Sequence, residues 1–146
     1  MILVEDLDCK GKMVFLRVDF NVPLDEKGDV RDDTRIKASL PTLNYLLSQK
    51  ARLVVASHLG RPKGKVDPKL SLKPVAKRLQ ELIQAKVILS PDVVGEKVNQ
   101  LKKELKENQV LLLENLRFCA EETANDSCFA KKLAEQVDYY VNDAFG

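Results

Sequence analysis

The only histidine of the chain lies in a short basic stretch, SHLGRPKGK, which spans residues 57–65. The stretch follows the apolar run RLVVA and holds three further cationic side chains besides His58. Glycine lets a backbone approach a ligand closely, and arginine grips phosphate or carboxylate with paired hydrogen bonds. These residue types therefore indicate an anion-binding loop, built from backbone and Arg61 together.

Two other kinds of loop share some of these residues. A P-loop has four residues between its glycines and a hydroxyl after the lysine. Here only three residues separate Gly60 from Gly64, and Val66 stands where the hydroxyl would be, so that motif is excluded. The GRPK core also occurs in hooks that enter the DNA minor groove. A non-enzymatic anion- or nucleic-acid-binding module that uses SHLGRPKGK therefore remains the alternative interpretation.

Polar residues follow several apolar runs at the point where each run ends. Asp19 and Asn21 end the first run, His58 and Arg61 follow the second, and Arg117 follows the fourth. Ligands of open α/β sheets bind beyond the carboxyl ends of the strands, so we expect these five side chains to gather. Cations beside a carboxylate and an amide suit a small hydroxylated anion, with arginine on the phosphate or carboxylate and Asp19 or Asn21 on a hydroxyl.

Three charged residues also have an ordinary structural interpretation. Arg17 is expected to pair with Asp19 or with a buried acid. Arg35, in the stretch DDTRI, could be an exposed helix-start residue that pairs with a neighbouring aspartate, a contact worth little. Glu114 could be a helix cap or a salt-bridge partner.

The elements that must position these residues follow from hydrophobic periodicity. Five runs rich in β-branched and aliphatic residues predict strands, and the second to fourth are apolar enough for burial on both faces. They are MVFLRVDFNV, RLVVAS, KVILS, QVLLLEN and DYYVNDAF. Because helical segments alternate with them, we predict an α/β fold of βαβ repeats, a Rossmann-like parallel sheet of about five strands with helices on both faces.

Four segments between the strands carry apolar residues at helical spacing. We expect Pro41 in the first turn of the first helix, and Ser71 as N-cap of the second with Pro74 in its first turn. Asn125 or Asp126 is expected to cap the fourth. The apolar positions are Ile36, Leu40, Leu43, Leu47; Val75, Leu79, Leu82, Ile83; Val94, Val98, Leu101, Leu105; and Phe129, Leu133, Val137.

Composition narrows the class of protein. The chain has 146 residues, 45% of them hydrophobic and 32% charged, which suits one globular domain with a real core. A net charge of +2 does not by itself indicate nucleic-acid binding. The three cysteines form no C-x-x-C pair, and no apolar stretch reaches the length of a membrane span. We expect free thiols, a cytoplasmic protein and no membrane partner.

Four long motifs, in order along nearly the whole chain, resemble the N-terminal domain of phosphoglycerate kinase. They are FLRVDFNVPLDEKGDVRDDTRIKASLPTL, VVASHLGRPKGK, LLLENLRF and YVNDAFG. The resemblance implies reversible phosphoryl transfer from 1,3-bisphosphoglycerate to ADP, which gives 3-phosphoglycerate and ATP. It implies that the full-length enzyme is a phosphotransferase that uses Mg-ATP and Mg-ADP, acts as a monomer and binds no nucleic acid.

The resemblance also implies roles for individual residues. Asp19, Asn21, His58, Arg61 and Arg117 would bind the glycerate substrate, with arginines on the phosphate that is not transferred. The remaining member of the set, Arg35, would bind substrate near the transferred group and act catalytically by stabilising transition-state charge.

Family members continue beyond the point where this sequence stops. We therefore expect residues 1–146 to be an incomplete N-terminal substrate-binding domain, with the C-terminal nucleotide-binding domain absent. Such a chain would supply the 3-phosphoglycerate half-site, bind no cofactor or metal itself and be inactive alone.

Overall fold

A five-stranded parallel sheet forms the centre of the computed structural model, which describes residues 8–62, 64–119 and 127–143. The strand order is β3-β4-β2-β1-β5, so β4, β2 and β1 lie inside the sheet while β3 and β5 form its edges. All neighbouring pairs are parallel, as the alternation of strands and helices predicts. The strands are β1 (Met13–Val18), β2 (Arg52–Ala56), β3 (Lys86–Leu89), β4 (Gln109–Leu112) and β5 (Tyr139–Asp143).

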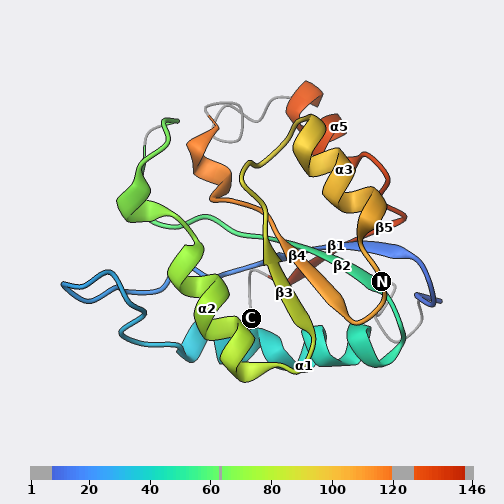
Figure 1. Cartoon of the computed structure of the whole chain (residues 1–146), viewed down its shortest axis with the longest axis horizontal. Helices are drawn as coiled ribbons and strands as arrows, with labels where there is room; N and C mark the ends of the chain where they lie inside the picture. The colour runs from blue at the N-terminus through green and yellow to red at the C-terminus, as the bar shows by residue number, and fades with distance from the viewer. Residues whose placement is uncertain (1–7, 63, 120–126, 144–146) are drawn as a thin grey trace.

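Helices cover both faces of this sheet, which confirms the predicted three-layer α/β/α architecture (Figure 1). Helices α1 (Thr34–Ser48) and α2 (Lys73–Leu82) bury Ile36 and Leu79, among other residues, against one face. Helices α3 (Glu96–Glu104) and α5 (Ser127–Ala134) contribute Val98 and Phe129 to the core on the other face. Short 3₁₀ turns, η2 (Pro68–Leu70) and η3 (Leu116–Phe118), lie in the loops at the carboxyl ends of the strands.

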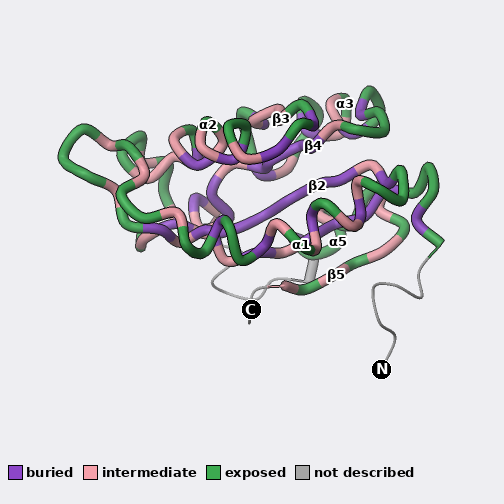
Figure 2. The backbone as a smooth tube through the Cα atoms, turned by 90° about the horizontal axis from the view of Figure 1, so that it is seen from below, coloured by how far each residue is buried: buried purple, intermediate pink, exposed green. Residues whose placement is uncertain are grey.

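Burial follows the position of each strand in the sheet. In β2 the residues from Leu53 to Ala56 are all buried, and Figure 2 shows this strand running through the middle of the molecule. The prediction that strands two to four are buried on both faces is wrong for β3, which is exposed at Lys86 and half-buried elsewhere. Its position at the edge explains the difference, because only β4 pairs with it.

Two predicted helix landmarks lie elsewhere. Pro41 is inside α1 rather than in its first turn, since the helix begins at Thr34. Proline has no N–H, so Pro41 cannot donate the usual helical hydrogen bond to the carbonyl of Lys37. Both residues are exposed, so water can bond that carbonyl instead. Leu72, not Ser71, is the N-cap residue of α2, although Ser71 Oγ still accepts a hydrogen bond from Lys73 N at 3.1 Å.

The apolar pattern also extends beyond the ends of the helices. Ile83 follows the last residue of α2, Val94 and Leu105 flank α3, and Val137 lies past the end of α5. These residues pack on the core from turns, which bury apolar side chains as well as a helix does. Pro74 is in the first turn of α2, as predicted, while the proposed caps at Asn125 and Asp126 fall outside the described residues.

A buried lysine joins the two helices on the second face. Lys102 of α3 is 1% exposed, and its Nζ donates to the carbonyls of Leu133 and Glu135, both at 3.0 Å. These carbonyls lie at the C-terminal end of α5, where a cation also interacts favourably with the helix dipole. Burial lowers the pKa of Lys102, with Glu135 opposing that shift. The contact fixes the helix that leads into β5.

Two further expectations from the sequence concern membrane spans and the cysteine thiols. Among the described residues, no helix is long and apolar enough to cross a membrane. Cys9 is a buried free thiol, and Cys119 is half-buried. Burial is the main reason that the pKa of Cys9 is raised, and the negative charge of Asp8 raises it further.

Candidate functional site

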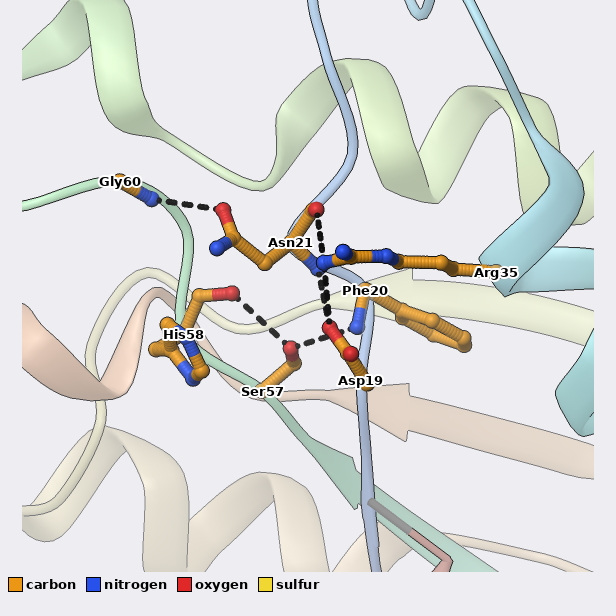
Figure 3. Close-up of polar contacts among 7 residues, drawn as sticks. All are labelled: Asp19, Phe20, Asn21, Arg35, Ser57, His58 and Gly60. Carbon is orange, nitrogen blue, oxygen red and sulfur yellow. Dashed lines mark hydrogen bonds and ion pairs between the residues drawn. The ribbon is translucent and has the colours of Figure 1, made fainter. Parts of the chain in front are cut away.

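Asp19 and Asn21, which follow β1, form the centre of a polar cluster with Arg35 (Figure 3). Asp19 Oδ1 accepts a hydrogen bond from Asn21 N at 3.1 Å, which closes a tight turn directly after the strand. Arg35 Nη1 donates to Asn21 O at 2.8 Å and to Asp19 Oδ1 at 3.3 Å. The arginine from the start of α1 is therefore held against the end of β1.

Arg35 thus pairs with Asp19 rather than with its near neighbours Asp32 and Asp33. Asp32 Oδ1 accepts from Thr34 N at 2.9 Å and from Thr34 Oγ1 at 2.6 Å, and these bonds lower the pKa of Asp32. Asp33 pairs with Arg78 of α2 instead. The Arg35 side chain is 53% exposed, so its guanidinium is fixed at one edge while most of it faces solvent.

Ser57, at the end of β2, joins the second strand to this cluster. Its Oγ accepts from Phe20 N at 2.9 Å and donates to His58 O at 3.0 Å. Asn21 Oδ1 in turn accepts from Gly60 N at 3.0 Å, as Figure 3 shows. The loop that carries His58 and Gly60 is therefore bonded directly to the turn after β1.

The backbone conformation at Gly60 explains why a glycine stands there. Its φ of +60° lies in the left-handed region, which a side chain strains. A Cβ at this position would also lie 2.8 Å from Leu70 Cδ2, closer than carbon atoms normally approach. Glycine at position 60 therefore allows the left-handed turn of the loop, and the next residue, Arg61, is exposed.

Asn115, three residues after the end of β4, holds the other side of the same loop. It is fully buried, and its Oδ1 accepts from Leu59 N and Arg117 N, both at 3.1 Å. Its Nδ2 donates to Leu59 O at 2.7 Å and to Leu70 O at 2.9 Å. One side chain thus satisfies four backbone groups in three segments, and it fixes the loops that carry Arg61 and Arg117.

Glu114 caps the start of helix α2, which is one of the two roles expected from the sequence. Its Oε1 accepts from Leu72 N and from Asn115 N, at 2.8 and 2.9 Å, and its Oε2 accepts from Ser71 Oγ at 2.7 Å. The carboxylate therefore satisfies a donor at the start of α2 and lies where the helix dipole favours negative charge.

All six predicted site residues lie in loops or helix starts at the carboxyl edge of the sheet, at the left of Figure 1. The structure brings Asp19, Asn21 and Arg35 into direct contact and bonds the His58 loop to them. The loops of Arg61 and Arg117 lie side by side, because Gly64 N donates to Arg117 O at 3.2 Å. Arg61 is exposed, and His58 and Arg117 are half-buried.

This arrangement can bind an anion that also carries a hydroxyl group. Three arginines and a histidine lie on three neighbouring segments, namely the start of α1, the loop after β2 and the turn η3. Arginine binds phosphate and carboxylate through paired N–H groups. Asp19 supplies an acceptor for a hydroxyl. Within residues 8–62, 64–119 and 127–143, no cluster of three or more His, Cys, Asp or Glu side chains could hold a metal ion.

Sequence reasoning from strand ends missed three residues that shape the site. Ser57 and Asn115 follow apolar strands, and that position was the signal that could have found them. The backbone groups that they bond belong to other loops, which the sequence does not specify. Arg78 is one of several basic residues on a helix surface, and only the packing of α2 beside the start of α1 distinguishes it.

The fold and the cluster define a parallel three-layer α/β domain with a candidate anion site at the carboxyl ends of its strands. Comparison with known protein families identifies the family to which this domain belongs. The phosphoglycerate kinase family profile matches residues 4–146, which is almost the whole chain. The chain belongs to the phosphoglycerate kinase family.

Individual relatives agree with this assignment. Phosphoglycerate kinase from Acidobacterium capsulatum is 57% identical over 150 residues, covering 98% of this chain and 37% of the relative. The cytosolic phosphoglycerate kinase of Triticum aestivum is 57% identical over 141 residues, covering 97% of this chain and 35% of the relative. The chain therefore spans somewhat more than a third of the length of these relatives.

A solved structure supports the fold. The crystal structure of phosphoglycerate kinase from Pyrococcus horikoshii matches 99% of this chain with a TM-score of 0.86 and 38% sequence identity. The match covers 37% of that protein.

Proposed function

We propose that residues 1–146 form the 3-phosphoglycerate half-site of a phosphoglycerate kinase, which transfers a phosphoryl group between 1,3-bisphosphoglycerate and ADP. The observation that carries this proposal is the guanidinium of Arg35, held by Asp19 and Asn21 beside the His58 loop. Family membership supports the assignment, because two of the four motifs of the resemblance contribute these residues.

The geometry suggests which residues bind each part of the substrate. Arg61 and Arg117, on the two joined loops, grip the phosphate that stays on the glycerate, together with His58. Asp19 and Asn21 bind the glycerate portion, and the carboxylate of Asp19 is the acceptor for its hydroxyl. Arg35 then faces the acyl end of the substrate, on the opposite side of the Asn21 turn.

The chemical step needs little from these residues besides position and charge. In the direction of ATP formation, the bond between phosphorus and the acyl oxygen breaks and a phosphate oxygen of ADP bonds to the phosphorus. The reverse reaction uses the substrate carboxylate as the attacking group. Arg35 orients that carboxylate and stabilises the negative charge that spreads over the transferred group, so the protein supplies no nucleophile.

The remaining partners are assigned by the same proposal. Mg-ADP and Mg-ATP bind a second, C-terminal domain of the full-length enzyme. Relatives support this proposal, because the chain covers only 37% of the phosphoglycerate kinase from Acidobacterium capsulatum. The full-length enzyme is a cytoplasmic monomer without nucleic-acid or membrane partners. Relatives named cytosolic support the location.

An activity assay tests this proposal. The full-length enzyme should form ATP from 1,3-bisphosphoglycerate and ADP, whereas a polypeptide of residues 1–146 should show no turnover, because it lacks a nucleotide site. ATP formation is followed in a coupled assay with the same molar amount of each protein. Turnover by the pure 146-residue polypeptide, or none by the full-length enzyme, would contradict the proposal.

A further inference from the structure

Arg78 of α2 makes a two-point contact with Asp33, the residue that immediately precedes α1. Its Nε and Nη2 atoms lie 2.8 and 2.6 Å from Asp33 Oδ2. The Asp33 side chain is 19% exposed and that of Arg78 is 34% exposed, so water screens this pair less than a fully exposed one. The hydrogen bond from Arg78 is the main reason that the pKa of Asp33 is lowered.

Asp33 does not use its carboxylate in the way that an aspartate at a helix start usually does. An N-cap aspartate normally accepts a hydrogen bond from a backbone N–H of its own helix. Asp33 makes no such bond, although it is the N-cap residue, and its other partner is Lys37 at 3.5 Å. Asp32 instead accepts from Thr34 N. The Asp33 carboxylate is thus available to fix α1 relative to α2.

The position of α1 determines where Arg35 lies. Arg35 is two residues after Asp33, in the first turn of the helix, and its guanidinium contacts Asp19 and Asn21. The helix on the other side of the contact is itself fixed, because Glu114 accepts a hydrogen bond from Leu72 N at the start of α2. A continuous series of contacts therefore links the ends of β4 and β1 through Arg78.

We propose that Arg78 is a positioning residue for Arg35, acting through Asp33 to fix the first turn of α1 relative to α2. The inference rests on the proposed function, since Arg35 matters only if it binds the substrate. Arg78 lies on the helix that follows the loop of His58 and Arg61, so its contact sets the spacing between Arg35 and that loop.

The first test measures the Arg35 side chain in the ligand-free chain. Nuclear relaxation of its Nε–Hε group should show an ordered guanidinium in the wild type. Arg78→Met, which keeps the apolar stem, should make Arg35 as mobile as the exposed Arg31. Arg78→Lys should restore part of the order, and Glu81→Gln, which removes only the 3.5 Å contact of Arg78, should change nothing. Unchanged order in Arg78→Met would overturn the inference.

The second test is a thermodynamic cycle of 3-phosphoglycerate binding. Arg78→Met should weaken binding about fivefold in the wild type and less than about twofold in an Arg35→Ala background, as expected of residues coupled through one network. An equal loss in both backgrounds would mean that Arg78 acts independently of Arg35, which overturns the inference. If the wild type does not bind 3-phosphoglycerate, the proposed function fails, and the relaxation measurement alone decides the role of Arg78.

Discussion

Replacing Arg35 by alanine should weaken 3-phosphoglycerate binding to the 146-residue chain by about 10- to 150-fold, since a hydrogen bond to a charged group contributes about 1.5–3 kcal/mol. The guanidinium is already held by Asp19 Oδ1 and Asn21 O, so the substrate meets a prearranged donor rather than one that binding must order. Calorimetric titration of the wild type and the variant measures the difference directly.

A matched control separates this effect from net charge. Arg31→Ala removes the same charge four positions earlier, from an exposed side chain outside the contacts of the site. It should leave the dissociation constant within about twofold, a change of less than 0.5 kcal/mol as expected for a surface substitution. Arg35 is itself 53% exposed, so both variants should unfold at nearly the wild-type temperature. Equal losses of affinity in the two variants would contradict a specific role for Arg35.

Replacing Asn115 by alanine should cost the fold at least about 3 kcal/mol in free energy of unfolding, because each buried polar group left without a partner costs about 1–3 kcal/mol. Four backbone groups lose their partner at once, namely the N–H and carbonyl of Leu59, the carbonyl of Leu70 and the N–H of Arg117. Urea unfolding of the chain measures the loss.

Asn44→Ala is the matched control for this second substitution. Asn44 is exposed on α1, where alanine favours the helix, so the change should lie within about 0.5 kcal/mol. Because Asn115 also fixes the loops of Arg61 and Arg117, the Asn115 variant should bind 3-phosphoglycerate more weakly under conditions where it remains folded. A loss below 1 kcal/mol would mean that water replaces the amide, and would remove Asn115 from the account of the site.

The fold was predictable because the chain uses two clear periodicities. Apolar runs such as RLVVA, bounded by polar residues, predict a buried strand, and alternation with helical segments then determines parallel pairing. Edge positions were not predictable, because the order β3-β4-β2-β1-β5 depends on crossovers that no local pattern specifies. That is why β3 was expected to be buried on both faces.

The site was predictable in outline from one topological rule. Residues at the carboxyl ends of parallel strands meet at one edge, which brought Asp19, Asn21 and the His58 loop together in the prediction and in the structure. Arg35 is different. It follows no strand, and local charges suggest a pairing with its neighbouring aspartates, so only the family resemblance implied a place in the site. Its contact with Asp19 depends on how α1 packs beside the end of β1.

The most direct test of the glycerate half-site is a calorimetric titration of the 146-residue chain with 3-phosphoglycerate, with ATP and a short A·T-rich duplex as controls. We expect 3-phosphoglycerate alone to bind, one molecule per chain, and Asp19→Ala to weaken it, because the acceptor for the hydroxyl is lost. A nucleic-acid-binding module would instead bind the duplex with steep salt dependence, and Asp19→Ala would strengthen that binding by removing a repelling charge. Duplex binding without affinity for 3-phosphoglycerate would contradict the assignment.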